Sequence, residues 1–226
     1  LQGRLLVQDS KDELLAAVES LAVSREKLRN EVEEDNNEKI TFEALKKHIY
    51  DISGQLAAHD ISNQDRAVIV LPNGPEMATA FLAISSYMSA APLNPSYKLS
   101  EYEFYLEDLK PKLVIVEENT SNPVVKAAKK LSIPIAEISV DKDNAAGEFS
   151  LFETRKSIDI PSIEMEALVL HTSGTTSRPK VVPLTQSNLV ASSGNISATL
   201  KLKEADHSLN IMPLFHIHGL IAVLCA

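Results

Sequence analysis

The sequence predicts an α/β fold, in which a mainly parallel sheet is flanked by helices. Two observations support this fold class. Short runs rich in β-branched residues alternate with longer segments that carry apolar residues at helical spacing. Repeated strand–helix units of this kind give parallel strands, with helices packed on both faces of the sheet. The composition agrees, because a chain of 226 residues with 44% hydrophobic side chains can bury a sizeable core.

The N-terminal region is predicted to be helical. Residues 1–37 form an expected lead-in, within which residues 10–32 are charged and favour a helix with leucines and valines on one face. Residues 38–226 are expected to form one domain, which opens with a helix over residues 39–58. Apolar side chains recur there three and four residues apart, as in an amphipathic helix. These positions are Leu45, Ile49, Ile52 and Leu56.

A strand and a helix are predicted next. Residues 66–72, RAVIVLP, form a β-branched run that ends at a proline, which is typical of a buried strand. Residues 73–90 are predicted to be helical, with Asn73 as the N-terminal cap and Pro75 in the first turn.

The alternation continues to the end of the chain. A helix over residues 99–109 is predicted to begin with a capping box formed by Ser100 and Glu103. An acidic, irregular segment at residues 141–162 interrupts the pattern. The other expected elements are strands at 112–118, 133–140, 166–174 and 208–213, an extended segment at 180–186, and helices at 122–132 and 186–201.

The charge and cysteine content argue against several classes of protein. The 22 basic and 31 acidic residues give a net charge of −9 without a long basic run, which argues against nucleic acid as the main partner. The single Cys225 excludes an internal disulfide and favours an intracellular, reducing compartment. Residues 77–93 are interrupted by serines and a proline, so they predict a buried helix and no membrane span. The chain ends inside an apolar run, residues 215–226, so we expect a C-terminal portion of the same protein to follow.

A polar loop stands out at residues 171–180, HTSGTTSRPK. It places five hydroxyl side chains within six residues, around Gly174, and follows them with Lys180. The loop leaves the end of a predicted strand, where α/β sheets bind their ligands. Hydroxyl and backbone N–H groups can donate to phosphate oxygens, and a lysine adds a mobile positive charge. The pattern is not a Walker A loop, since Pro179 precedes the lysine, and its composition alone leaves a plain polar surface loop open.

Residues 172–180, TSGTTSRPK, resemble the phosphate-loop signature of the adenylate-forming superfamily, which includes acyl-CoA synthetases, luciferases and the adenylation domains of peptide synthetases. Residues 212–220, MPLFHIHGL, resemble the next signature of this family, and residues 91–116 resemble its upstream region. The similarity is closest to the oxalate–CoA ligase subgroup of plants and fungi. It implies that residues 38–226 are an incomplete N-terminal AMP-binding domain, without the later subdomains and the C-terminal domain.

The resemblance implies an ATP-dependent acid–CoA ligase, which forms an acyl-adenylate and then a CoA thioester from a small carboxylic acid such as oxalate. ATP, Mg²⁺ and coenzyme A are the implied cofactors and co-substrates, with Thr172 as the implied metal contact. His216 is implied as the catalytic and substrate-binding residue, and His218 as a second substrate contact. The implied phosphate binders are Thr172, Ser173, Gly174, Thr175, Thr176, Ser177 and Lys180.

Two positions depart from the general signature. Ser177 replaces its second glycine, and Val181 replaces the glycine that usually follows the lysine. If position 181 requires a positive φ, a β-branched valine there is strained. His171, just before the loop, is expected to pack and not to take part in the chemistry. The remaining histidines are expected at the surface: His48, His59 and His207.

Two alternatives stay open. The chain can belong to a ligase of the same superfamily for another carboxylic acid, or it can be a truncated, non-catalytic module that binds a nucleotide or a partner. The family's adenine-binding segment, ribose-binding aspartate, hinge and C-terminal lysine do not occur within the 226 residues, so the fragment alone is expected to be inactive. The resemblance implies a cytoplasmic or peroxisomal enzyme.

Overall fold

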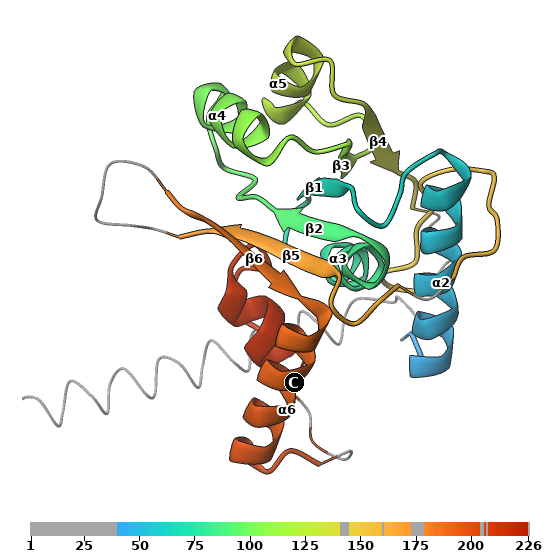
Figure 1. Cartoon of the computed structure of the whole chain (residues 1–226), viewed down its shortest axis with the longest axis vertical. Helices are drawn as coiled ribbons and strands as arrows, with labels where there is room; N and C mark the ends of the chain where they lie inside the picture. Colours follow the sequence, from blue (N-terminus) through green and yellow to red (C-terminus); the bar gives the residue numbers. More distant parts are fainter. Residues whose placement is uncertain are drawn as a thin grey trace, which may run out of the picture. The chain divides into compact units, whose positions relative to one another are not determined.

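The computed structural model describes residues 40–140, 145–159, 161–172, 179–203, 206 and 208–225. Within these ranges, six strands form one sheet in the order β4-β3-β1-β2-β5-β6 (Figure 1). The expected lead-in, residues 1–37, lies outside the described residues, so its helix and the domain boundary stay predictions. The strands are β1 Arg66–Val70, β2 Ser89–Pro92, β3 Leu113–Glu117, β4 Ile135–Ile138, β5 Glu166–His171 and β6 Val181–Thr185.

Helices connect the first four strands in chain order, β1 to β4, and helices cover both faces of the sheet (Figure 1). No helix in the described part of the chain has both the length and the hydropathy needed to cross a bilayer. The α-helices are α2 Phe42–Ala58, α3 Pro75–Tyr87, α4 Leu99–Leu109, α5 Val124–Lys130 and α6 Gln186–Leu200, and a π-helix, η1, spans His218–Leu224.

The strand directions confirm the predicted fold class. From β4 to β5 all neighbouring strands run parallel, and β6 pairs with β5 in the antiparallel direction. Parallel sheets of this kind are buried on both faces. In β1, Ala67 and Ile69 belong to the hydrophobic cluster that includes α2 and α3, whereas Val68 and Val70 belong to the cluster that includes α4 and α5.

The structure corrects the prediction at both ends of α3. The helix has Pro75 as its first residue and Gly74 as its N-cap, so Asn73 is not the predicted cap. It ends at Tyr87, and Ser89–Pro92, predicted as helix, form strand β2 between β1 and β5. The small residues of β2 have little intrinsic strand propensity. Pairing with β1 and complete burial decide their conformation instead.

The start of α4 also differs from the prediction. The N-cap is Lys98, whose backbone N–H donates to the carboxylate of Glu101 (2.8 Å). The predicted capping box of Ser100 and Glu103 is therefore wrong. Glu103 forms an ion pair with Lys130 of α5 instead (2.9 Å).

Residues 208–213, predicted as a strand, are irregular in the described positions. The Oδ1 atom of Asn210 accepts a hydrogen bond from the N–H of Met212 (2.9 Å). A side chain thus satisfies a backbone donor that a neighbouring strand would satisfy in a sheet.

The histidines outside the site differ in their burial. His48, expected at the surface, is buried in α2, and its ring lies edge-on to Phe149 with the centroids 4.9 Å apart. Burial lowers the pKa of His48. His59 is exposed, as predicted, and stacks on Phe152. His207 lies outside the described residues.

Candidate functional site

Two segments that the sequence analysis selected lie at the carboxyl edge of the sheet, where the parallel strands β1, β2 and β5 end. The first is the polar loop, which leaves β5 after His171 and returns at Val181. The second is residues 212–219, which are hydrogen-bonded to Asn73, just past β1. Open α/β sheets bind ligands at this edge. The carboxyl edge is therefore the candidate site.

The loop stem, Thr172 and Lys180, joins the two ends of the polar loop. The N–H of Thr172 donates to the carbonyl oxygen of Lys180 (2.9 Å), and the N–H of Lys180 donates to Thr172 Oγ1 (3.4 Å). Both residues are exposed. An exposed hydroxyl residue and an exposed lysine are thus paired through their backbones at a strand end, and residues of these two types can bind an anion. The other predicted phosphate binders lie outside the described residues: Ser173, Gly174, Thr175, Thr176 and Ser177.

Val181 does not carry the strain that the sequence raised as a possibility. It is the first residue of β6 and pairs with His171 of β5. It does not occur among the described non-glycine residues that have a positive φ. An extended conformation suits a β-branched side chain, so valine fits this position of the stem.

His171 attaches the end of β5 to α4. Its Nε2 atom lies 3.0 Å from Oδ2 of Asp108, and the histidine side chain is only 6% exposed. The ring of Tyr105 meets the imidazole edge-on, with the centroids 4.7 Å apart. His171 therefore packs beneath the stem, in agreement with the prediction.

Residues 212–219 begin with a turn that is anchored in the core. The N–H of His216 donates to the carbonyl oxygen of Pro213 (3.1 Å). Leu214 is buried, with 6% exposure, and belongs to the same hydrophobic cluster as α3. Its N–H donates to Oδ1 of Asn73 (2.9 Å). The turn is thus held against the end of β1 by the buried Leu214 and by the hydrogen bond to Asn73, and Leu220, just after it, is buried in the same cluster.

His216 and His218, the predicted acid contacts, are both exposed. The ring centroid of His216 lies 4.7 Å from that of Phe215, with the ring planes at 47°. His218 is the first residue of η1. The structure therefore presents both imidazoles to solvent at the carboxyl edge.

Asn73 holds residues 212–219 at this edge, a role that was not predicted from the sequence. Its position between a strand and a proline led to its prediction as a helix cap. Its partner in the structure, Leu214, is 141 residues away, so no local pattern could reveal the contact. The only available signal was its place at the end of a buried strand.

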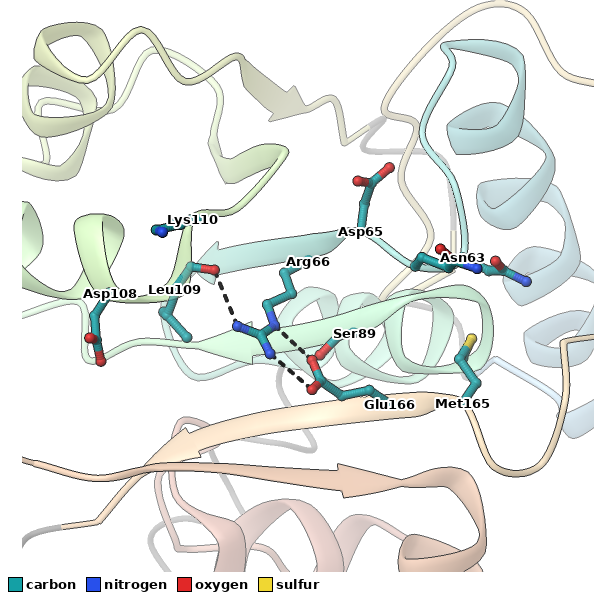
Figure 2. Close-up of a pocket in the computed structure, with 10 residues that line it drawn as sticks. Asn63, Asp65, Arg66, Ser89, Asp108, Leu109, Lys110, Met165 and Glu166 are labelled. Carbon is teal, nitrogen blue, oxygen red and sulfur yellow. Dashed lines mark hydrogen bonds and ion pairs between the residues drawn. The ribbon is translucent and has the colours of Figure 1, made fainter.

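A cavity of about 640 Å³ lies at the opposite, amino edge of the sheet, where β1, β2 and β5 begin (Figure 2). The guanidinium of Arg66 makes a bidentate ion pair with Glu166, at 2.7 and 2.9 Å, and also donates to the carbonyl oxygen of Leu109 (3.4 Å). Burial alone would raise the pKa of Glu166, but hydrogen bonding and the charge of Arg66 outweigh it and hold that pKa below its ordinary value. The hydrogen bond to Glu166 raises the pKa of Arg66. Arg66 and Glu166 thus pair with each other, and no described residue of the polar loop or of residues 212–219 lines this cavity, so it is a weaker candidate site.

Comparison with known proteins gives consistent results. Residues 19–226 match the family of AMP-binding enzymes. An oxalate–CoA ligase of Arabidopsis thaliana is 40% identical over 166 residues, which cover 71% of this chain and 32% of that protein. An oxalate–CoA ligase of Saccharomyces cerevisiae is 37% identical over 191 residues, which cover 73% of this chain and 35% of that protein. Among solved structures, an o-succinylbenzoate CoA synthetase from Bacillus subtilis, in complex with its acyl-adenylate intermediate, matches with a TM-score of 0.68 and 29% identity, covering 84% of this chain and 47% of that one.

These matches confirm the resemblance seen in the sequence. The chain spans about a third of the length of the oxalate–CoA ligases that it matches. The family match includes the loop stem and residues 212–219, the two segments that meet the carboxyl edge of the sheet. The chain belongs to the AMP-binding enzymes, the adenylate-forming superfamily.

Proposed function

We propose that this chain is the N-terminal part of an ATP-dependent acid–CoA ligase. In the proposed reaction, a carboxylate oxygen attacks the α-phosphorus of ATP and pyrophosphate leaves. The thiol of coenzyme A then attacks the acyl carbon, and AMP leaves. The observation that carries the proposal is the arrangement of both signatures along one edge of the sheet, with the loop stem at the end of β5 and residues 212–219 at the end of β1.

The polar loop is the proposed site of the β- and γ-phosphates. Lys180 supplies a positive charge, and Thr172, whose hydroxyl accepts from the backbone N–H of Lys180, supplies a hydroxyl at the stem. As pyrophosphate leaves, negative charge shifts onto its oxygens, and donors already held in place stabilise that charge without having to reorganise. The residues between them contribute further hydroxyl and N–H donors in this proposal: Ser173, Gly174, Thr175, Thr176 and Ser177.

Mg²⁺ accompanies ATP in the proposed reaction and neutralises part of the triphosphate charge. The described residues contain no group of three or more His, Cys, Asp or Glu side chains that could hold a metal ion. Mg²⁺ keeps several waters and binds largely through substrate phosphates, so it requires few protein ligands. The exposed hydroxyl of Thr172 is the protein oxygen that we assign to it.

Oxalate is the proposed acid. Relatives at 40% and 37% identity are oxalate–CoA ligases. Oxalate is a small dianion, so the carboxylate that does not react needs hydrogen-bond donors and gains nothing from an apolar pocket. His216 can donate through its imidazole and is assigned as the residue that binds and orients the acid, with His218 as a second donor.

A different acid is the alternative. The similarity to an o-succinylbenzoate CoA synthetase favours it. That substrate also carries a second carboxylate, so exposed imidazoles at His216 and His218 suit both acids.

Acid-dependent ATP–pyrophosphate exchange by the complete protein separates these candidates. Oxalate, o-succinylbenzoate and a medium-chain fatty acid are compared at saturating ATP and Mg²⁺. We expect the highest kcat/KM with oxalate. A higher value with o-succinylbenzoate would support the alternative acid, whereas nucleotide binding without exchange for any acid would indicate a non-catalytic module.

A further inference from the structure

Asn73 links two segments that lie far apart in the sequence. It follows β1 at the carboxyl edge, and its Oδ1 atom accepts a hydrogen bond from the N–H of Leu214, 141 residues along the chain (2.9 Å). The side chain of Leu214 is buried, with 6% exposure, so its amide is in a region where an unpaired donor is unfavourable. The bond therefore fixes how residues 212–219 meet the end of β1.

The side chain of Asn210 makes two hydrogen bonds to the backbone of this same segment. Its Oδ1 accepts from the N–H of Met212 (2.9 Å), and its Nδ2 donates to the carbonyl oxygen of Gly219 (3.2 Å). A glycine is required for this close approach, because a Cβ atom at position 219 would lie 2.5 Å from the carbonyl oxygen of Pro213. Residues 210–219 are thus a closed unit whose internal hydrogen bonds do not involve Asn73.

His216 is carried by this unit. Its N–H donates to the carbonyl oxygen of Pro213 (3.1 Å), and its own carbonyl oxygen accepts from the N–H of Leu220 (3.2 Å). The place of its imidazole relative to the sheet depends on what attaches the unit to the sheet. We propose that Asn73 is a positioning residue, which sets the place of His216 and through it the affinity for the acid. This inference rests on the proposed function.

A cavity of about 430 Å³ gives the unit room to shift. It is lined by Asn73 and Ala78 on the side of β1 and α3, and by Asn210, Met212 and Leu214 on the side of the unit. A close-packed interface would resist a displacement, but an adjacent cavity permits one. Leu214 and Leu220 are buried in the core on either side of His216, so removing the hydrogen bond is expected to shift His216 within the turn between them and not to detach the turn.

Exchange kinetics of the complete protein test the role of Asn73. In Asn73→Ala, we expect the KM for the acid to rise roughly tenfold to a hundredfold, because small misplacements of a substrate contact are expensive. The KM for ATP should stay within about twofold, because the loop stem does not depend on this bond. Asn73→Asp keeps an oxygen acceptor at the same place, so it should restore most of the acid affinity, measured at high ionic strength to screen its charge. Asn63→Ala is the matched control, since Asn63 is an exposed asparagine at the amino edge.

Hydrogen–deuterium exchange tests the hydrogen bond without relying on activity. A peptide that contains Leu214 should take up deuterium faster in Asn73→Ala, whereas Asn73→Asp and Asn63→Ala should match the wild type. Unchanged uptake, or an unchanged KM for the acid in an active Asn73→Ala enzyme, would overturn the inference. If the wild type catalyses no ATP–pyrophosphate exchange with any acid, the proposed function is contradicted. The deuterium uptake of the Leu214 peptide would then still test whether the side chain of Asn73 holds the N–H of Leu214.

Discussion

The two edges of the sheet differ in the charged groups that lie next to each candidate site, although each edge has an exposed lysine, Lys110 at the amino edge and Lys180 at the carboxyl edge. At the amino edge, Arg66 and Glu166 neutralise each other through two hydrogen bonds, next to a cavity of about 640 Å³ (Figure 2). At the carboxyl edge, Thr172, Lys180 and His216 are exposed, and no described residue forms an ion pair with Lys180. Charges that pair within the protein stabilise the fold, whereas exposed donors can serve a ligand. The size of a cavity is therefore a poorer guide to the site than the state of its charges.

Replacing Lys180 by alanine is expected to have the largest effect on activity. The substitution removes the positive charge at the stem, so the rate of ATP–pyrophosphate exchange should fall roughly a hundredfold to a thousandfold, as when one preorganised donor to a developing anion is lost. The melting temperature should change little, because Lys180 is exposed. Lys112→Ala removes an exposed lysine near the amino edge and serves as the control. An equal loss of exchange rate in Lys180→Ala and Lys112→Ala would contradict a specific role of the carboxyl edge.

Glu166→Gln is expected to have the opposite profile. It breaks an ion pair whose side chains are each 30% exposed, so it should lower the free energy of unfolding by about 1–2 kcal/mol. The exchange rate of the folded enzyme should stay within about twofold of the wild type, because the pair lies away from the carboxyl edge. Urea denaturation measures the first quantity and exchange kinetics the second. Glu164→Gln changes an exposed carboxylate at the amino edge and should leave both unchanged.

The pH dependence of the free energy of unfolding provides a further, smaller test of the ion pair at the amino edge. The pKa of Glu166 is lowered in the folded state. Such a group contributes stability that is present above the unfolded-state pKa of about 4.3 and is lost as the pH falls through the folded-state pKa. The difference in unfolding free energy between the wild type and Glu166→Gln should therefore be constant from pH 7 to about pH 5 and shrink as the pH falls further. A difference that stays constant below the ordinary glutamate pKa would show that the ion pair does not stabilise the fold.

The sequence predicts those elements whose local pattern and buried environment agree. β1 and β3 are runs of β-branched residues, and each lies in the middle of the sheet. The apolar spacing of α2 likewise matches its buried face, which includes Ile52 and Leu56. β2 was missed because Ser89–Pro92 have no strand pattern of their own and depend on pairing with β1 and β5.

The candidate site likewise has a part that the sequence predicts and a part that it does not. The polar loop is a contiguous signature, so the sequence alone points to Thr172 and Lys180. The support of His216 is not contiguous, because Asn73 and Leu214 are separated by 141 residues. Asn210 offers no clearer signal, since the structure uses its side chain where the sequence predicted a strand. Polar contacts between residues this far apart in the sequence can be identified only once the three-dimensional structure is known.

Transfer of oxygen from the acid to AMP tests the central claim most directly. In the proposed reaction, the attacking carboxylate oxygen becomes bonded to the α-phosphorus, and it leaves with AMP when coenzyme A attacks the acyl carbon. The complete protein is supplied with ¹⁸O-labelled oxalate, ATP, Mg²⁺ and coenzyme A, and the nucleotide product is analysed by mass spectrometry. The account predicts AMP that carries a single ¹⁸O atom from the acid. Unlabelled AMP, or ADP as the nucleotide product, would contradict it.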